Sequence, residues 1–149
     1  MEGIEADIFL VIQSVCGSTL GLELDGPDGR SGDASLEQPI GALVEISGET
    51  PASLLLECSE AMARAAASAM FVMEPDELTS RDLQDAVSEL VNIIAGNVRA
   101  LVSAGSQLGI PQATVESAEN RGGFEPDHEF NLSCDGMPFR LSATALDQE

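Results

Sequence analysis

Residues 79–105, TSRDLQDAVSELVNIIAGNVRALVSAG, form the longest stretch of this chain with the period of an amphipathic helix. Thr79 is suited to cap the first turn, and Asp82 stands three residues later, where the partner residue of a capping box belongs. At 3.6 residues per turn one face is apolar and must face the core; it holds Leu83, Val87, Leu90, Ile94, Val98, Leu101 and Val102. The pattern predicts a helix that continues to about Gly105, with about 25 residues and a length of roughly 37 Å.

The opposite face of this helix is polar and holds Asp85, Ser88, Glu89, Asn92, Gly96, Arg99 and Ser103. Glu89 and Asn92 are three residues apart and therefore neighbours on one stripe, with Asp85 one turn earlier. Gly96 lies one turn after Asn92 and leaves a shallow spot beside it. Asn and Gly each disfavour a helix by roughly 0.5 to 1 kcal/mol relative to Ala. Their presence favours a functional stripe over the alternative, a merely solvated face in which this spacing arose by chance.

The segments around this helix predict a mixed fold. Residues 5–17, EADIFLVIQSVCG, have helical spacing and end at Gly17, a plausible C-cap. Apolar runs at 40–46 and 54–56 around SGETP predict a hairpin. Ser59 is suited to cap an alanine-rich helix that ends near residues 73–75.

The remaining segments complete the predicted sheet. Residues 111–117 resemble a strand, and residues 128–146 resemble two strands around an Asp135-Gly136 turn. Residues 25–38 are rich in Gly, Asp, Pro and Ser and predict a loop. We therefore expect an α+β fold with a mostly antiparallel sheet of about six strands, on which the long helix and the shorter alanine-rich helix pack.

Composition excludes several classes of partner. The chain of 149 residues has the length of one domain, 1–149, with 44% apolar residues for a single core. Its net charge of −20 repels nucleic acid and anionic membrane surfaces. The N-terminus carries acidic residues where a signal peptide carries basic ones, and no stretch approaches about 18 apolar residues. We expect a cytoplasmic protein that binds neither nucleic acid nor membrane.

The potential metal ligands are scattered. Cys16, Cys58 and Cys134 are far apart in sequence and are expected to be buried free thiols. Asp127, His128 and Glu129 are adjacent in a predicted strand, so their side chains alternate between its two faces. The loop DGPDGRSGD places Arg30 and Gly32 where calcium needs oxygen ligands. No metal site of the chain's own is expected.

The segment DAVSELVNIIAGN, residues 85–97, resembles the signature of the CheX-like chemotaxis phosphatases of the CheC/CheX/FliY family. The family pattern is Asp or Ser, three residues, Glu, two residues, Asn, and Asp85, Glu89 and Asn92 fill it. The order of a hairpin, an alanine-rich helix, the motif helix and a strand after a proline is also similar, from about Ile40 to Leu146. The resemblance implies a CheC-like fold.

The resemblance also implies the chemistry, which is hydrolysis of the aspartyl-phosphate of a CheY-like response regulator. Asn92 would align the attacking water and Glu89 would pair with the active-site lysine of the receiver domain, while Asp85, Ser88 and Gly96 would contact the partner. The receiver would supply the phosphorylated Asp and its Mg²⁺. CheX-like proteins are typically dimeric, so a homodimer is expected.

One departure from the family pattern concerns the second helix. Family members with two sites carry a second Glu-Asn pair there, whereas this chain has Glu60 followed by Ala63. The resemblance therefore implies one site per chain. The alternative function is a noncatalytic adaptor of the same fold that binds a receiver domain or a flagellar-switch component.

Overall fold

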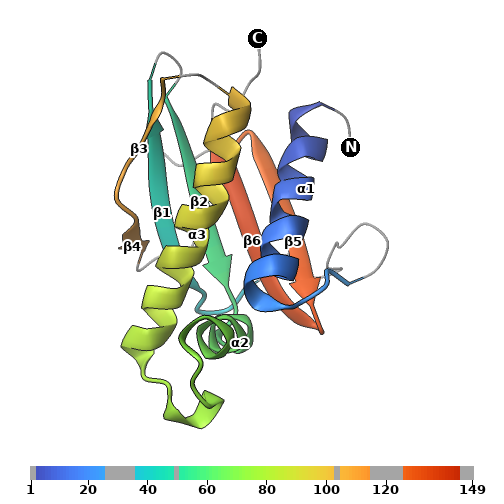
Figure 1. The fold of residues 1–149 in the computed structure, drawn as a ribbon, viewed down its shortest axis with the longest axis vertical. Helices are drawn as coiled ribbons and strands as arrows, with labels where there is room; N and C mark the ends of the chain where they lie inside the picture. The colour runs from blue at the N-terminus through green and yellow to red at the C-terminus, as the bar shows by residue number, and fades with distance from the viewer. Residues whose placement is uncertain (1–2, 26–35, 49–50, 103–104, 115–125, 145–149) are drawn as a thin grey trace.

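The computed structural model describes residues 3–25, 36–48, 51–102, 105–114 and 126–144. Within them three α-helices lie on one face of a six-stranded antiparallel sheet (Figure 1). The elements are α1 (Ile4–Val15), η1 (Cys16–Leu20), β1 (Ile40–Ser47), β2 (Ala52–Cys58), α2 (Glu60–Phe71), η2 (Pro75–Glu77), α3 (Ser80–Val102), β3 (Gln107–Leu108), β4 (Gln112–Thr114), β5 (His128–Cys134) and β6 (Met137–Thr144). The predicted fold class and number of strands are confirmed.

The sheet has the order β3-β1-β2-β6-β5, and β4 also pairs with β1. The predicted hairpin is confirmed as β1 and β2, and its register aligns Ile40 with Cys58 and Ile46 with Ala52. β3 pairs with the end of β1 and β4 with its beginning, so the two short strands together form one interrupted edge strand. The chain has no other described strand at that edge, and α3 therefore rests on β1 near a border of the sheet.

The core fills the space between the helices and the sheet. On the predicted apolar face of α3, five residues are at most 4% exposed: Leu83, Val87, Leu90, Ile94 and Val98. Leu101 is half-buried, and the side chain of Val102 lies outside the described residues, as does Ser103. Ala86, Val91 and Ala95 widen the buried face beyond the predicted stripe. The helix thus packs on two sides, against the sheet and against α1 and α2.

Both predicted helix caps are present. The Ser59 hydroxyl accepts a hydrogen bond from the Met62 N–H at 3.1 Å. The Thr79 hydroxyl accepts from the Asp82 N–H at 3.2 Å, and the Asp82 carboxylate accepts from the Thr79 N–H at 2.9 Å. This reciprocal pair satisfies backbone donors at the start of α3 and fixes where the helix begins.

The end of the first helix was predicted wrongly. The chain does not leave the helix at Gly17 but continues through the π-helical turn η1 to Leu20. The left-handed residue that terminates it is Gly21, with φ 68°. Space for a Cβ atom is open at Gly17, so glycine is not required there, whereas the positive φ at Gly21 favours glycine.

Other predicted boundaries fall partly outside the described residues. The described part of α3 has 23 residues and runs to Val102, and residues 103 and 104, before the predicted end near Gly105, are not described. The strand predicted at 111–117 is seen as Gln112–Thr114, and residues 115–117 are not described. Most of the loop predicted at 25–38 is likewise outside the described ranges. The turn at Asp135 and Gly136 is confirmed, with φ 50° and 75°.

A charged pair is buried on the sheet face opposite the helices. Glu57 in β2 and Arg140 in β6 are directly opposite each other in the ladder and are 0% and 2% exposed. Their Oε1 and Nη1 atoms are 3.5 Å apart. Arg140 Nε also donates to Asn131 Oδ1 in β5 at 2.9 Å. A polar row therefore crosses three strands and favours one pairing register.

Asp25 clamps the β5–β6 turn to the segment after α1. Its carboxylate accepts hydrogen bonds from the Gly136 N–H at 2.8 Å, the Ser133 hydroxyl at 2.7 Å and the Asp135 N–H at 2.9 Å. These bonds, the one from Gly136 above all, hold the pKa of Asp25 below its usual 3.8. The turn thus depends on an ionised carboxylate contributed from a distant part of the chain.

The three cysteines are buried and free, as predicted. They converge beneath η1, where the thiols of Cys16 and Cys134 are hydrogen-bonded and Cys58 lies near Cys16. Burial raises the pKa of the Cys58 thiol. Buried thiols of this kind serve packing rather than chemistry. No helix in the described ranges has the length and apolar character needed to cross a lipid bilayer.

We predict that Arg140→Met lowers the free energy of unfolding by about 3 to 5 kcal/mol, because Glu57 then stays buried without the charge of Arg140. Adding Glu57→Leu should cost less than the sum of the two single changes, which a urea-unfolding double-mutant cycle measures. Arg64→Met is the control, since Arg64 pairs with Glu60 and donates to the Pro75 carbonyl oxygen at the surface, and these two contacts contribute at most about 1 kcal/mol each. Equal losses for Arg140→Met and Arg64→Met would contradict the prediction.

We predict that Asp25→Asn destabilises the protein at neutral pH and that the difference disappears in acid. A carboxylate whose pKa is lowered in the folded state contributes stability above its unfolded pKa. That contribution is lost as the pH falls from about 3.8 through the lower folded pKa. Urea unfolding of wild type and variant between pH 7 and pH 3 measures the effect. A difference that stays constant over this range would show that the charge of Asp25 contributes nothing.

Candidate functional site

The predicted site residues all lie on one face of α3. Asp85 and Glu89 are exposed, and Ser88, Asn92 and Gly96 are half-buried. Because α3 is anchored by its apolar face, this polar stripe is held on a rigid surface that points away from the core. The structure thus brings together the five residues that the sequence analysis selected.

Two asparagines on α3 differ in what their side chains do. Asn97 donates from Nδ2 to the Ile93 carbonyl oxygen at 2.8 Å and is therefore bound to its own helix. The side chain of Asn92 forms no hydrogen bond within the described part of the chain, and neither does that of Glu89 one turn before it. A half-buried amide without a partner retains its full capacity to donate and accept. Asn92 is therefore available for a group brought by another molecule.

Gly96 leaves open space next to Asn92. A Cβ atom added at this position would meet no atom within 4 Å. Nothing in the protein's own packing therefore requires glycine here, although glycine destabilises a helix interior by about 1 kcal/mol relative to alanine. The shallow spot predicted from the sequence is present, and a partner surface is the remaining candidate for what it accommodates.

Sequence reasoning did not select Gln84, which lies on the same side of the helix. Its Nε2 donates to the Gly41 carbonyl oxygen of β1 at 2.9 Å and to Ser88 Oγ at 3.4 Å. Gln84, Ser88 and Asn92 follow each other at intervals of four residues, so they form one row along α3. This spacing was the available signal, but a glutamine on a polar helix face is usually solvated and gave no reason to choose it.

The second helix offers no equivalent stripe. Glu60 is exposed near the start of α2, but Ala63 three residues later is 0% exposed and belongs to the core. An asparagine at that position would be buried rather than presented. The described structure therefore supports a single Glu-Asn pair, the one on α3.

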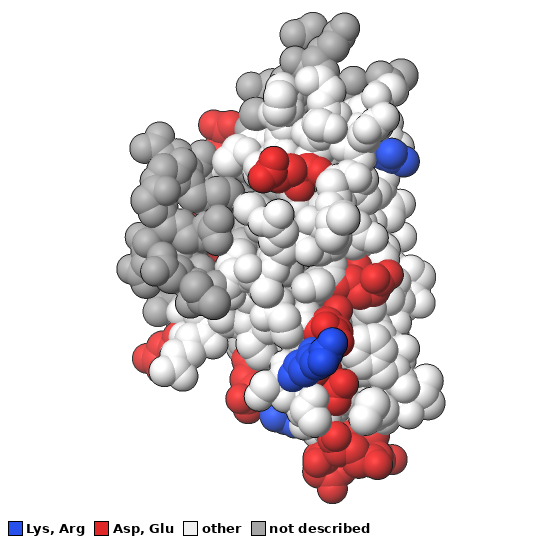
Figure 2. Space-filling model, turned by 90° about the vertical axis from the view of Figure 1, so that its left-hand side faces the viewer, with Lys and Arg blue, Asp and Glu red and all other residues white. Residues whose placement is uncertain are grey.

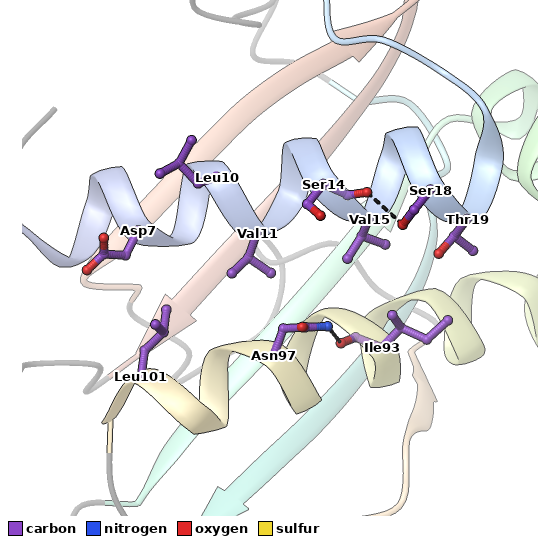
Figure 3. A pocket seen from close by; sticks show the side chains of 10 residues that line it. All are labelled: Asp7, Leu10, Val11, Ser14, Val15, Ser18, Thr19, Ile93, Asn97 and Leu101. Atoms are coloured by element: carbon purple, nitrogen blue, oxygen red, sulfur yellow. Dashed lines mark hydrogen bonds between the residues drawn. The ribbon is translucent and has the colours of Figure 1, made fainter.

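A groove of about 360 Å³ lies between α1 and α3 (Figure 3). On α3 it is lined by residues outside the stripe, Ile93, Asn97 and Leu101. Val11 and Val15 of α1 and Leu101 of α3 point into it. The Ser18 hydroxyl donates to the Ser14 carbonyl oxygen at 2.8 Å, and Asn97 is bound in the same way to its own helix. The groove is thus lined by apolar side chains and a few polar ones, two of which, Ser18 and Asn97, are bound to their own helices.

His128 has a structural role in the described residues. Its Nδ1 lies 3.2 Å from Oε1 of Glu5, which links β5 to α1, and its side chain is 12% exposed. Glu129 is exposed and accepts a hydrogen bond from Asn131. Among the described side chains, no group of three or more His, Cys, Asp and Glu residues is arranged to hold a metal ion.

The surface around the start of α3 is acidic. Figure 2 shows the side that lies on the left in Figure 1, where Asp and Glu side chains, with Arg side chains between them, gather over the lower part of the molecule. Exposed acidic residues there include Glu74, Asp76 and Glu77 in and next to η2, and Asp85 and Glu89 on α3. The negative electrostatic potential of these carboxylates attracts a partner whose facing surface is basic.

The side chains of the stripe limit the chemistry. It holds no thiol, and nothing near Ser88 among the described residues is placed to act as a general base for it. An amide does not transfer protons near neutral pH, but it can orient a water molecule through its carbonyl oxygen. A carboxylate beside it can pair with a cation. The arrangement therefore fits half of a composite site, whose reacting groups come from a partner.

Comparison with known proteins supports the same family. The sequence model described as Chemotaxis phosphatase CheX matches residues 40–121. No curated protein has a sequence that matches this chain significantly.

Several solved structures share the fold. A CheX protein from Vibrio vulnificus is similar with a TM-score of 0.74 and 16% identity, over 96% of each chain. A chain of the CheX-CheY-BeF3-Mg²⁺ complex from Borrelia burgdorferi has a TM-score of 0.63 and 19% identity, over 93% of this chain and 96% of that one. FliY from Thermotoga maritima has a TM-score of 0.56 and 12% identity, over 95% and 89%.

The matched region, residues 40–121, covers more than half of the chain and includes the whole of α3 with Glu89 and Asn92. It extends from β1, on which α3 packs, through both helices that follow it. The chain therefore belongs to the CheX family of chemotaxis phosphatases.

Proposed function

We propose that this protein accelerates hydrolysis of the aspartyl-phosphate of a CheY-like response regulator, with one site per chain. The observation that carries the proposal is the free Asn92 amide beside Glu89 on a firmly packed helix, in a chain of the CheX family. The similarity to a structure that contains both CheX and CheY supports a CheY-like partner.

In the proposed mechanism the attacking water is aligned by Asn92. The amide oxygen accepts one hydrogen of the water and directs its lone pair at the phosphorus atom. Orientation of this kind is able to lower a hydrolysis barrier by several kcal/mol without any proton transfer by the amide. The absence of an internal partner for Asn92 favours this role, because no bond within the described chain has to break first.

Glu89 and the receiver domain supply the remaining groups. Glu89 pairs with the active-site lysine of the receiver and fixes how the two proteins dock. The receiver contributes the phosphorylated Asp and the Mg²⁺ that neutralises the phosphoryl oxygens. Asp85 and Ser88 border the contact, and the open space at Gly96 lets the partner approach the helix closely. This protein needs no metal or cofactor of its own in this mechanism.

The acidic surface assists the encounter. The net charge of −20 includes the exposed carboxylates near η2 and the start of α3. A receiver with a basic surface beside its phosphorylation site would be steered towards the stripe, and the association rate would fall with added salt. Response regulators act in the cytoplasm, which is where this function places the protein.

The alternative is a noncatalytic adaptor that binds a receiver or a flagellar-switch component. The fold is shared with FliY of Thermotoga maritima and, with a TM-score of 0.52, with the FliM middle domain of H. pylori. The intact pair of Glu89 and Asn92 favours catalysis over this alternative. A phosphate-release assay with purified phosphorylated regulators and Mg²⁺ separates the two, because an adaptor binds saturably without accelerating release.

We predict that Asn92→Ala retains or gains stability, by up to about 0.5 kcal/mol, because alanine is the better helix former and no hydrogen bond is lost. Phosphatase activity should nevertheless fall by about a hundredfold or more, since the group that positions the water is gone. Urea unfolding and the rate of phosphate release, measured on the same preparations, test both parts.

Matched variants on the same helices control this experiment. Asn97→Ala changes an asparagine outside the stripe and should leave the rate unchanged. Glu89→Ala should mainly weaken docking, whereas Glu60→Ala on α2 should not. Gly96→Ala should stabilise the helix and impair docking by filling the shallow spot. A destabilised Asn92→Ala with full activity per folded molecule would refute the catalytic assignment and leave the adaptor function ahead.

We also predict a homodimer. β5 ends the strand order on one side of the sheet, and edge strands offer backbone groups for pairing with a second copy. Light scattering at micromolar concentration should give twice the chain mass of 15.5 kDa. A mass of one chain under these conditions would contradict the prediction.

A further inference from the structure

The side-chain amide of Gln84 connects the stripe of α3 to the sheet. Its nitrogen must face the Gly41 carbonyl oxygen, because that oxygen only accepts hydrogen bonds. This requirement settles the orientation of the amide group. The second N–H of the same nitrogen then points to Ser88 Oγ, 3.4 Å away.

Gly41, which accepts this hydrogen bond, is paired on both sides in the sheet. It is buried in β1 and pairs with Glu57 of β2 on one side and Thr114 of β4 on the other. A Cβ atom on Gly41 would collide with Thr114 Oγ1, so the Thr114 side chain occupies the space beside Gly41. The Gln84 amide is therefore held by a part of the backbone that has little freedom to move.

The bond from Gln84 determines what the Ser88 hydroxyl can do. Ser88 Oγ accepts from Gln84, so its own hydrogen points elsewhere. Within the described residues this hydrogen has no acceptor. The row from Gln84 through Ser88 to Asn92 turns outward by about 40° per step at 3.6 residues per turn, from β1 towards the exposed stripe. The hydroxyl hydrogen is thus available to an acceptor on the surface where the proposed partner docks.

We infer that Gln84 is a positioning residue, which holds the Ser88 hydroxyl so that it donates a hydrogen bond to an anionic oxygen in the active site of the phosphorylated receiver. This inference rests on the proposed function and adds a third polar group to Glu89 and Asn92. An anionic acceptor is the natural partner for a free O–H donor, and charge-assisted bonds of this kind are about twice as strong as neutral ones.

A purely structural role for Gln84 predicts different behaviour. If the amide only fastened α3 to β1, its loss would act on stability and on the position of the whole helix. That effect would be the same whether residue 88 is serine or alanine. If Gln84 acts through the hydroxyl, its loss has no further effect once the hydroxyl is gone.

The test measures kcat and KM for phosphate release with wild type, Gln84→Ala, Ser88→Ala and the double variant. Each single change should lower kcat about tenfold or more and raise KM about tenfold, because the hydroxyl binds the anionic oxygen before as well as during hydrolysis, and the double variant should match the singles. Gln84→Glu has nearly the same shape but lacks the N–H donor, so it should behave like Gln84→Ala. Asn97→Ala removes a similar amide-to-carbonyl bond elsewhere on α3 and should leave kcat unchanged.

A binding measurement separates failure of this inference from failure of the proposed function. If the wild type binds a receiver activated with beryllofluoride but does not accelerate phosphate release, the proposed function fails. The inference then predicts that Gln84→Ala and Ser88→Ala each raise Kd about tenfold, again without adding.

Two results would overturn the inference. One is a Gln84→Ala variant whose kcat and Kd equal those of the wild type. The other is a loss that adds to that of Ser88→Ala, which would leave Gln84 as a structural tether only. Urea unfolding of every variant ensures that folded molecules are compared.

Discussion

The burial of one face of α3 against β1 and β2 is the constraint on which the rest of the structure depends. Leu90 and Ile94 are almost completely buried, so the rotation of the helix about its axis is fixed. Fixing the rotation also fixes where the polar stripe points. Packing against the sheet therefore sets the direction of the stripe, and the bond from Gln84 to Ser88 adds to it.

The sequence predicted the structure best where a regular hydrophobic pattern ended at a recognisable cap or turn residue. The hairpin of β1 and β2, the caps at Ser59 and Thr79 and the Asp135-Gly136 turn follow from local chemistry, and the structure has all of them. The predicted helix end at Gly17 was wrong because, without the backbone angles, a glycine inside a helix cannot be distinguished from a glycine that ends one. β3 has only two residues and exists through its pairing with Ile46 and Ser47, which no local pattern reveals.

The placement of the candidate site on one face of α3 was predictable to a similar degree, and its function stays a prediction. The spacing of Asp85, Glu89 and Asn92, together with their resemblance to a known signature, was sufficient to find the stripe and its face. The connection of Gln84 to Gly41 joins residues 43 positions apart, and only the fold brings them into contact. The difference between Asn92 and Asn97 is equally invisible in sequence, since both are asparagines on one helix. What a side chain is free to do depends on the neighbours that tertiary structure supplies.

The three buried thiols, Cys16, Cys58 and Cys134, allow the packing of the N-terminal helix to be followed chemically. The chain has no other cysteine, and all three are shielded while α1 and η1 stay packed on the sheet. A thiol-reactive probe will therefore modify the protein only when this packing opens, at a rate that measures the opening equilibrium. Pulse labelling would resolve partial opening at the N-terminal helix from global unfolding, without introducing any foreign label into α3.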